Sequence, residues 1–225
     1  MIDDALIQRI TRQVMQRMQD ETAPAGPRPH TNGDKPQVMV NISVRHCHLC
    51  REHLEILYGS GSELEPRNPL YQPGEFASKS TVTLVGPRMR CLGEVRVLGP
   101  LRKATQVEVS RTDAIYLGID PPVKPSGSHE GSVGLILVGP VGVVHLKQGV
   151  ILANRHIHMS AESAKRWNFT DNQTVKVRIR TPRKTTVFED VQLRVSEKFL
   201  DEMHVDTDDG NAAGLRGGEM VEVFV

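Results

Sequence analysis

An internal repeat constrains the fold more than any other feature of this sequence. Residues 40–58 read VNISVRHCHLCREHLEILY, and residues 150–167 read VILANRHIHMSAESAKRW. Each copy has an apolar run with strand character, then Arg-His-x-His, and then a polar residue that opens a short helix. A four-residue match arises easily by chance, whereas a match over strand, motif and helix together indicates two related domains.

The rest of the chain from residue 38 onward is a series of short strand-like runs separated by turn signals such as QPGE and VGPVG. The low aromatic content of 4%, together with 19 Gly and 14 Pro, fits short strands and many turns. We therefore expect a mainly β fold of two related β-barrel domains with short capping helices near residues 50–58 and 161–167. The first barrel region covers 38–146 and the second 147–225, with an exchange of strands between them left open.

The first 37 residues have a different pattern. Apolar side chains recur at three- and four-residue steps over residues 1–19, which predicts an amphipathic helix. Residues 20–37 are rich in Pro, Gly and polar groups and predict a flexible linker. Such a helix either docks on its own domain or binds another protein, and the length of the linker favours a partner.

Composition excludes several classes of function. The chain has 28 Lys+Arg against 27 Asp+Glu, a net charge of +1, which gives no basis for nucleic acid or a membrane surface as a partner. No apolar stretch approaches the roughly 20 residues of a spanning helix, and residues 1–19 contain no apolar signal-peptide core. Three cysteines without a framework spacing indicate a reducing compartment. We therefore expect an intracellular protein.

The two His-x-His pairs are the strongest chemical signal. His46 and His48 form one pair, and His156 and His158 form the other. Side chains alternate along a strand, so both imidazoles of a pair lie on one face and can bind one metal ion, for which zinc is well suited. One such pair is commonly a surface coincidence, but two copies in the same setting favour metal binding.

Each pair needs further ligands, and the sequence offers two candidates. His204 lies in a strand-like segment before a Gly- and Ala-rich turn, and Glu108 is a carboxylate on a predicted strand. The other histidines are interpreted as ordinary linker, surface or hydrogen-bonded side chains: His30, His53, His129 and His145.

The cysteines complicate the first pair, because HCHLC also fits a mixed Cys/His zinc knuckle. Cys47 lies between the two histidines, so on a strand it points to the opposite face. Cys50 would share the histidine face only if the strand continued through it, and a helix is predicted to start there. Buried thiols are the better interpretation of both, and of Cys91.

Several segments, taken in order, resemble the PduL-type phosphate acyltransferases. The resemblance covers the chain from about residue 38 onward and is carried by SVRHCHL, QPGEFASKSTVTLVGP, EVRVLGPLRKATQVEVS, LGIDPPVKPSG, ILANRHIHMS and EMHVDTDDGNAAGL. Members of this family have two β-barrels with capping helices and bind two zinc ions between them. The departure is HCHLC, where members usually carry an apolar residue and a Ser or Thr, which leaves open whether the thiols affect the site.

The resemblance implies the roles of particular residues. It implies two zinc sites, one formed by His46, His48 and Glu108 with the sulfur of coenzyme A, the other by His156, His158 and His204 with water. Arg102 corresponds to the family's phosphate-binding arginine. Some members carry an N-terminal helix and linker for entry into a bacterial microcompartment, which residues 1–37 resemble.

The expected function is therefore the exchange of coenzyme A for phosphate on a short acyl group, propanoyl or acetyl, in the lumen of a microcompartment in the bacterial cytoplasm. Residues 1–19 would bind the shell or other lumen enzymes, and a homodimer is compatible with the resemblance. Zinc would bind the thiolate and polarise the acyl group, and no GxSxG or P-loop motif supports another chemistry. Two alternatives stay open: a zinc-dependent acyl-CoA thioesterase, and a zinc-stabilised scaffold without activity.

Overall fold

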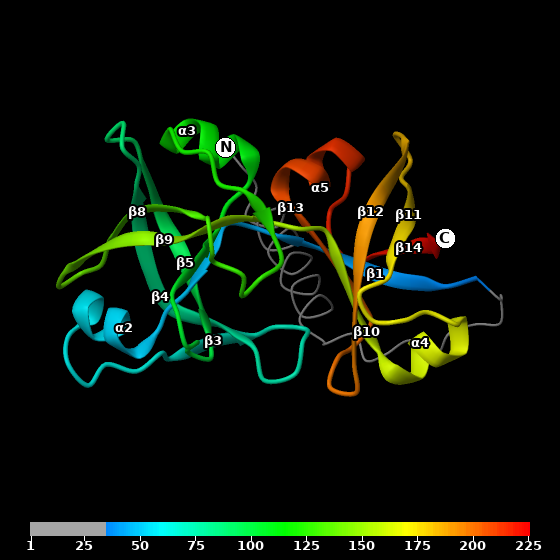
Figure 1. The fold of residues 1–225 in the computed structure, drawn as a ribbon, viewed down its shortest axis with the longest axis horizontal. Coiled ribbons are helices and arrows are strands. Elements are labelled where there is room, and N and C mark those ends of the chain that lie inside the picture. The colour runs from blue at the N-terminus through cyan, green and yellow to red at the C-terminus, as the bar shows by residue number, and fades with distance from the viewer. Residues whose placement is uncertain (1–34) are drawn as a thin grey trace, which may run out of the picture. The chain divides into compact units, whose positions relative to one another are not determined.

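A computed structural model of the chain describes residues 35–225 (Figure 1). The predicted helix over 1–19 and the linker up to residue 34 lie outside these residues. In the part of the chain that is described, no helix has the length and apolar character needed to span a membrane.

Six strands close the first barrel, which we call barrel one. Neighbouring strands pair in the order β2, β5, β4, β8, β9 and β6, and β6 pairs with β2 again. Two short strands extend this sheet at its margins. The bounds are β2 His46–His48, β3 Pro66–Pro69, β4 Phe76–Val85, β5 Cys91–Gly99, β6 Gln106–Glu108, β7 Val123–Lys124, β8 Val133–Val138 and β9 Val143–Ala153.

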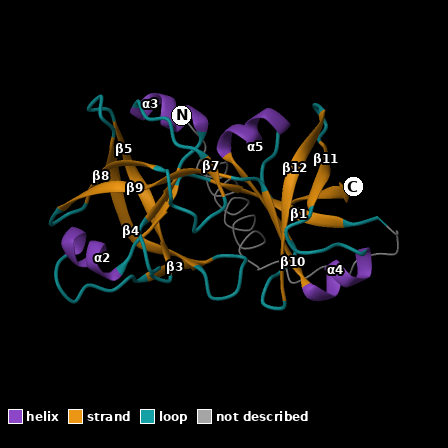
Figure 2. Ribbon diagram, in the orientation of Figure 1, coloured by secondary structure: helices purple, strands orange, loops and turns teal. Residues whose placement is uncertain are grey.

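Barrel two is a closed ring of β1, β13, β10, β12, β11 and β14. Its strands lie beside those of barrel one in the ribbon coloured by secondary structure (Figure 2). The bounds are β1 Gln37–Ser43, β10 His156–Ser160, β11 Thr174–Arg180, β12 Thr185–Ser196, β13 Glu202–Asp206 and β14 Glu219–Phe224.

The two rings have the same pairing scheme. Each His-x-His strand lies parallel to one neighbour and antiparallel to the other: β2 between β5 and β6, and β10 between β12 and β13. The remaining pairings correspond one to one, with β9 in barrel one taking the place of β1 in barrel two. The prediction of two related β-barrels is confirmed.

The chain exchanges one strand between the barrels. β1 belongs to barrel two and leads directly into β2 of barrel one, whereas β9 belongs to barrel one and leads into β10 of barrel two. Val38 and Val40 of β1 are accordingly buried in the core of barrel two. The predicted boundary between residues 146 and 147 falls inside β9. The division into a first barrel region 38–146 and a second 147–225 stays a prediction.

Each barrel has its own apolar core. Inward-facing Val and Leu side chains contribute to both, with Ile157 and Ile179 in barrel two, as the period-two patterns of the strands require. Cys47 is fully buried in the core of barrel one, which confirms its predicted orientation. Cys50 is only half-buried at the start of a helix, and Cys91 is exposed, so the prediction of buried thiols is wrong for Cys91.

Four short helices cap the barrels within residues 35–225, two more than the sequence analysis expected: α2 Arg51–Tyr58, α3 Arg111–Leu117, α4 Ala161–Trp167 and α5 Thr207–Ala213. The helices not expected follow β6 and β13, the strands opposite the His-x-His pairs. The side chain of Ser110 caps α3 and that of Asp206 caps α5. Figure 1 shows α3 and α5 close together, and the backbone N–H of Thr112 donates to Asp208 at 2.8 Å.

Candidate metal and anion site

The first group of candidate ligands is formed by adjacent strands of barrel one. His46 and His48 lie on β2, and Glu108 on β6 is the antiparallel partner of His46. Their candidate ligand atoms all lie within 4.8 Å of one another, and His46 Nε2 is 3.6 Å from the Glu108 carboxylate. All three side chains are buried. The structure therefore brings together the three residues of the first predicted ligand set.

The second group repeats this arrangement in barrel two. His156 and His158 lie on β10, and His204 on β13 is the antiparallel partner of His156. Their candidate ligand atoms also lie within 4.8 Å of one another. His204 thus takes the position that Glu108 has in barrel one, so one group contains a carboxylate and the other three imidazoles.

The first histidine of each pair is oriented by the backbone. His46 Nδ1 lies 2.9 Å from the carbonyl oxygen of Val44, and His156 Nδ1 lies 2.8 Å from that of Asn154. A carbonyl oxygen only accepts, so in the neutral form of each ring Nδ1 carries the proton and Nε2 presents the lone pair. An imidazole in this state is ready to bind a metal ion.

The remaining ring nitrogens also suit a metal site. His48 Nδ1, His204 Nε2 and both ring nitrogens of His158 are buried without a partner in hydrogen-bond geometry among the described residues, although a carboxylate lies within ion-pair distance of His204 Nε2. Burial lowers the pKa of His48 to about 2, that of His158 to about 3 and that of His156 to about 4. These three imidazoles are therefore neutral at neutral pH, and leaving the named ring nitrogens of His48 and His158 buried without partners is costly unless an ion is bound.

The arginine that precedes each His-x-His pair has a structural role. Arg45 binds Asp113 at 2.8 and 2.7 Å, and Arg155 binds Asp209 at 2.6 and 2.9 Å. Both aspartates lie in the first turn of the helix that follows the opposite strand, α3 or α5. Each arginine therefore fixes the helix end beside its own ligand group, which explains why the motif includes it.

Arg102 lies in the loop between β5 and β6, and its guanidinium is fixed from two sides. Its Nη1 donates to the hydroxyl of Ser126 at 2.9 Å, and its Nη2 lies 3.9 Å from the carboxylate of Glu75. The backbone N–H of Arg102 also donates to the carbonyl oxygen of Leu49 at 2.9 Å. Burial lowers the pKa of this guanidinium, while the carboxylates of Glu108 and Glu75 act to raise it.

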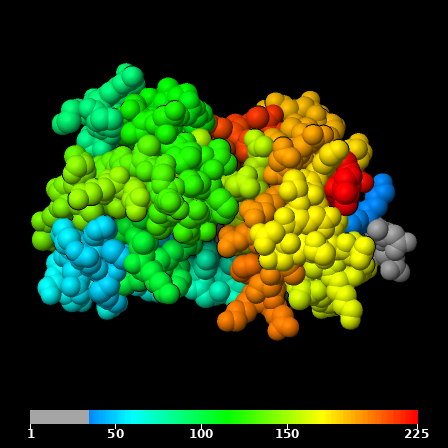
Figure 3. All heavy atoms as spheres, viewed as in Figure 1, coloured from blue at the N-terminus to red at the C-terminus, as the bar shows by residue number. Residues whose placement is uncertain are grey.

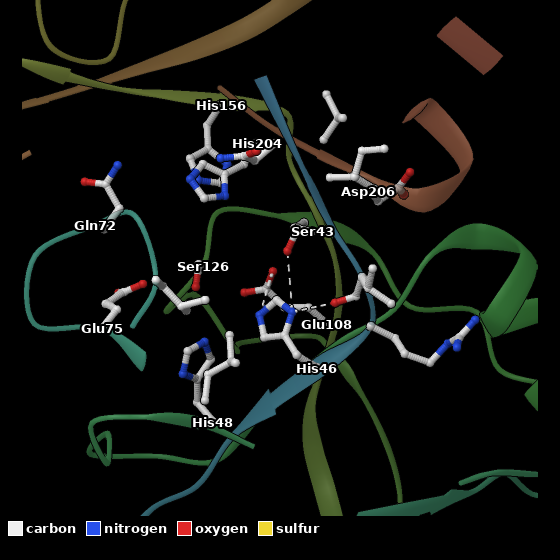
Figure 4. A pocket seen from close by; sticks show the side chains of 18 of the residues that line it. Ser43, His46, His48, Gln72, Glu75, Glu108, Ser126, His156, His204 and Asp206 are labelled. Atoms are coloured by element: carbon white, nitrogen blue, oxygen red, sulfur yellow. Dashed lines mark hydrogen bonds and ion pairs between the residues drawn. The ribbon is translucent and has the colours of Figure 1, made fainter. Parts of the chain in front are cut away.

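Both ligand groups and Arg102 line one cavity of about 600 Å³ whose walls come from both barrels. In Figure 4, the labelled side chains of His156 and His204 lie on one side, His46, His48 and Glu108 on another, and Ser126 between them. In the space-filling view, barrel one lies on the left, mostly cyan to green, and barrel two lies on the right, mostly yellow to red (Figure 3). The cavity has the size of a small-molecule site and is rich in metal-binding and cationic groups.

Sequence reasoning missed a hydrogen-bonded layer behind Glu108. The side-chain amide of Gln106 donates to Glu108 at 2.6 Å and to Ser126 at 2.8 Å, and its oxygen lies 2.8 Å from His129 Nε2. His129, interpreted from the sequence as ordinary, therefore belongs to this network. Burial acts to raise the pKa of Glu108, but His46 and the hydroxyl of Ser126 outweigh it and hold that pKa below its ordinary value.

Sequence reasoning also missed two residues of barrel two. Arg194 on β12 is the parallel partner of His158 and lines the cavity. Glu202 on β13 is buried, and its carboxylate lies 2.9 Å from His204 Nε2. Burial acts to raise the pKa of Glu202, but His204 and amide donors outweigh it and lower that pKa. The His-x-His signal gave no indication of either, because both lie far from it in the sequence.

The fold and the site define a class: a double-barrel protein with two groups of candidate metal ligands and Arg102 in one cavity. A family model described as phosphate propanoyltransferase matches residues 39–216. The phosphate propanoyltransferase of Thermotoga maritima is 49% identical over 84% of this chain and 90% of its own length. Those of Planctopirus limnophila and Lachnoclostridium phytofermentans are 44% and 42% identical, each over 99% of this chain and over 91% and 100% of their own lengths.

The chain therefore belongs to the phosphate propanoyltransferase family, whose members are acyltransferases. This membership confirms the resemblance found in the sequence.

Proposed function

We propose that the protein interconverts a short-chain acyl-CoA, propanoyl-CoA or acetyl-CoA, and phosphate with acyl phosphate and free coenzyme A, using two zinc ions. The observation that carries the proposal is the meeting of both ligand groups and Arg102 in one cavity. Zinc is the best-suited metal for a site with three imidazoles, or with two imidazoles and a carboxylate, and a fourth position kept for substrate. Membership of the family supports the same reaction.

The residues that would hold zinc are the two ligand groups described above. Bound there, zinc supplies a partner for the thiolate of coenzyme A and a Lewis acid for the acyl oxygen. The backbone-bound Nδ1 atoms of His46 and His156 orient both imidazoles before any ligand arrives, so the sites are preorganised.

Arg102 would hold the phosphate. Phosphate is a weak and strongly hydrated nucleophile, so the protein must bind and orient it next to the acyl group. A guanidinium does this with two parallel hydrogen bonds, which the ammonium of a lysine cannot make. Ser126 and Glu75 hold the guanidinium in place, and Arg194 adds further positive charge to the same cavity.

A coupled-product assay tests the proposed reaction. Release of free coenzyme A from propanoyl-CoA is expected to require phosphate and to produce propanoyl phosphate in equal amount, and in reverse the acyl phosphate should acylate coenzyme A. Thiol release that is independent of phosphate would instead show a zinc-dependent thioesterase. Bound zinc without any acyl transfer would show a scaffold module.

The N-terminal segment is proposed to direct the enzyme into a bacterial microcompartment, with the shell or another lumen enzyme as its partner. The support is the apolar stripe of residues 1–19 and the Pro- and Gly-rich segment after it. Deleting residues 1–33 is expected to leave kcat nearly unchanged, to improve solubility and to abolish targeting of a fused fluorescent reporter.

Ile10→Asp should abolish targeting of the reporter as the deletion does, because it places a charge in the middle of the apolar stripe. Gln8→Asp serves as its control. It adds the same charge outside the residues of the stripe, so the reporter should still be targeted. Loss of activity or folding in the truncated enzyme, with normal targeting by Ile10→Asp, would contradict the proposal. Gel filtration of the same proteins tests the predicted homodimer.

A further inference from the structure

Glu202 is a buried carboxylate next to the second ligand group. It lies two residues from His204 on β13, is 3% exposed, and its carboxylate is 2.9 Å from His204 Nε2. Its side chain lines the cavity that contains both ligand groups. A carboxylate at this depth needs partners, because an isolated buried charge is very costly.

Amide groups from two distant segments bind this carboxylate. Asn41 on β1 donates to it at 2.6 Å, and Gln72 in the β3–β4 connection of barrel one donates at 2.7 Å. Gln72 is itself held by both backbone groups of Leu200, at 3.0 and 3.2 Å. The described residues contain no lysine or arginine that forms an ion pair with Glu202. The arrangement therefore fixes a negative charge without a permanent cation beside it.

The equivalent position in barrel one explains what this charge is for. Glu202 is the antiparallel partner of His158, as Gln106 is of His48. In barrel one the ligand group already contains a carboxylate, Glu108, and its neighbour is a neutral amide. In barrel two the group has three imidazoles, and its neighbour is the carboxylate. Each group therefore has one negative charge, either as a ligand or directly behind one.

We propose that Glu202 is a positioning residue that holds His204 and supplies the negative charge of the second metal group. This inference rests on the proposed metal function of His156, His158 and His204. A carboxylate behind a histidine ligand fixes the ring and strengthens it as a donor. The amide of Gln72 makes barrel one part of this support, because Gln72 lies in the β3–β4 connection and lines the same cavity.

Glu202→Gln removes the charge and keeps the shape. The oxygen of the introduced amide can take the place of the carboxylate oxygen that faces His204 and Gln72, and the side-chain amide of Asn41 can turn to accept from the new NH₂ group. We expect the dissociation constant of one zinc equivalent to rise about tenfold or more, measured by competition with a chromogenic chelator. The melting temperature of the metal-free protein should be unchanged, which a merely structural role would not give.

Two variants assign the effect. Glu222→Gln removes another hydrogen-bonded carboxylate of barrel two, bound to Arg178 and Lys35 away from the cavity, and should leave zinc affinity as in the wild type. His156→Ala removes the second site, so adding Glu202→Gln to it should weaken zinc binding no further.

The outcomes separate this inference from the proposed function. If the wild-type protein binds two zinc equivalents and Glu202→Gln holds both with unchanged affinity, the inference is wrong and the metal sites stand. Additive losses in the double variant would place the effect of Glu202 at the other metal group and also overturn it. If the wild-type protein binds no zinc, the proposed function itself fails.

Discussion

Replacing His156 and His158 by alanine is expected to remove about one of the two zinc equivalents and to lower kcat by about 10³-fold. Both imidazoles face the cavity, and neither ring nitrogen of His158 has a hydrogen-bond partner among the described residues. Loss of a Lewis acid that is worth several kcal/mol in the transition state gives a rate effect of this size. Metal content by atomic emission and the phosphate-dependent release of coenzyme A measure the two effects.

The double variant should still fold, because the change removes polar rings that line the cavity rather than apolar core. What it loses is the hydrogen bond of His156 Nδ1 to the Asn154 carbonyl oxygen and the stacking of His158 on Phe199. The melting temperature of the metal-free protein is therefore expected to change little, because removing the two buried, unpartnered ring nitrogens of His158 offsets the loss of these contacts. His145→Ala serves as a control: this histidine is exposed on β9, away from the cavity, and its loss should change neither zinc nor rate. Full metal content and activity in the double variant would refute the metal assignment.

The sequence predicted those parts of the fold and site that depend on local pattern. Period-two alternation places His156 and His158 on one face of a strand, whatever that strand pairs with. The short helices after the two His-x-His pairs were also predicted, because their signal lies in the residues that directly follow each pair. α3 was missed although its signal was local: Ser110 and Asp113 form a capping box that the surrounding strand-like runs obscured.

The features that were not predicted depend on which segments meet. A strand pattern does not name its partner, so nothing in VMVNISV showed that β1 belongs to barrel two. Gln72 and Glu202 are separated by 130 positions in the sequence, and their contact forms only when both barrels are in place. Gln106 on β6 likewise contacts His129, which lies in the loop between β7 and β8. A single polar residue carries no periodic signal, so such supporting layers become visible only in the structure.

Arg102→Lys is expected to raise the KM for phosphate about tenfold or more, because a charged hydrogen bond of about 1.5–3 kcal/mol is lost while the positive charge is kept. The KM for acyl-CoA should change far less, since the role assigned to Arg102 is limited to phosphate. Initial rates measured against each substrate in turn separate these two effects. Arg51→Lys provides a matched control, because that guanidinium is paired with Glu63 on the surface.

Two further variants test whether the guanidinium acts as a held fork. Ser126→Ala removes the hydroxyl that Arg102 Nη1 donates to, so the KM for phosphate should rise by less than in Arg102→Lys. In Arg102→Ala, added guanidinium ion should restore part of the lost rate at low phosphate, whereas added ammonium should not, because only guanidinium reproduces the planar donor pair. A collapse of acyl-CoA affinity with unchanged phosphate dependence would instead mean that Arg102 binds coenzyme A, and Arg194 would then be the candidate for phosphate in the same cavity.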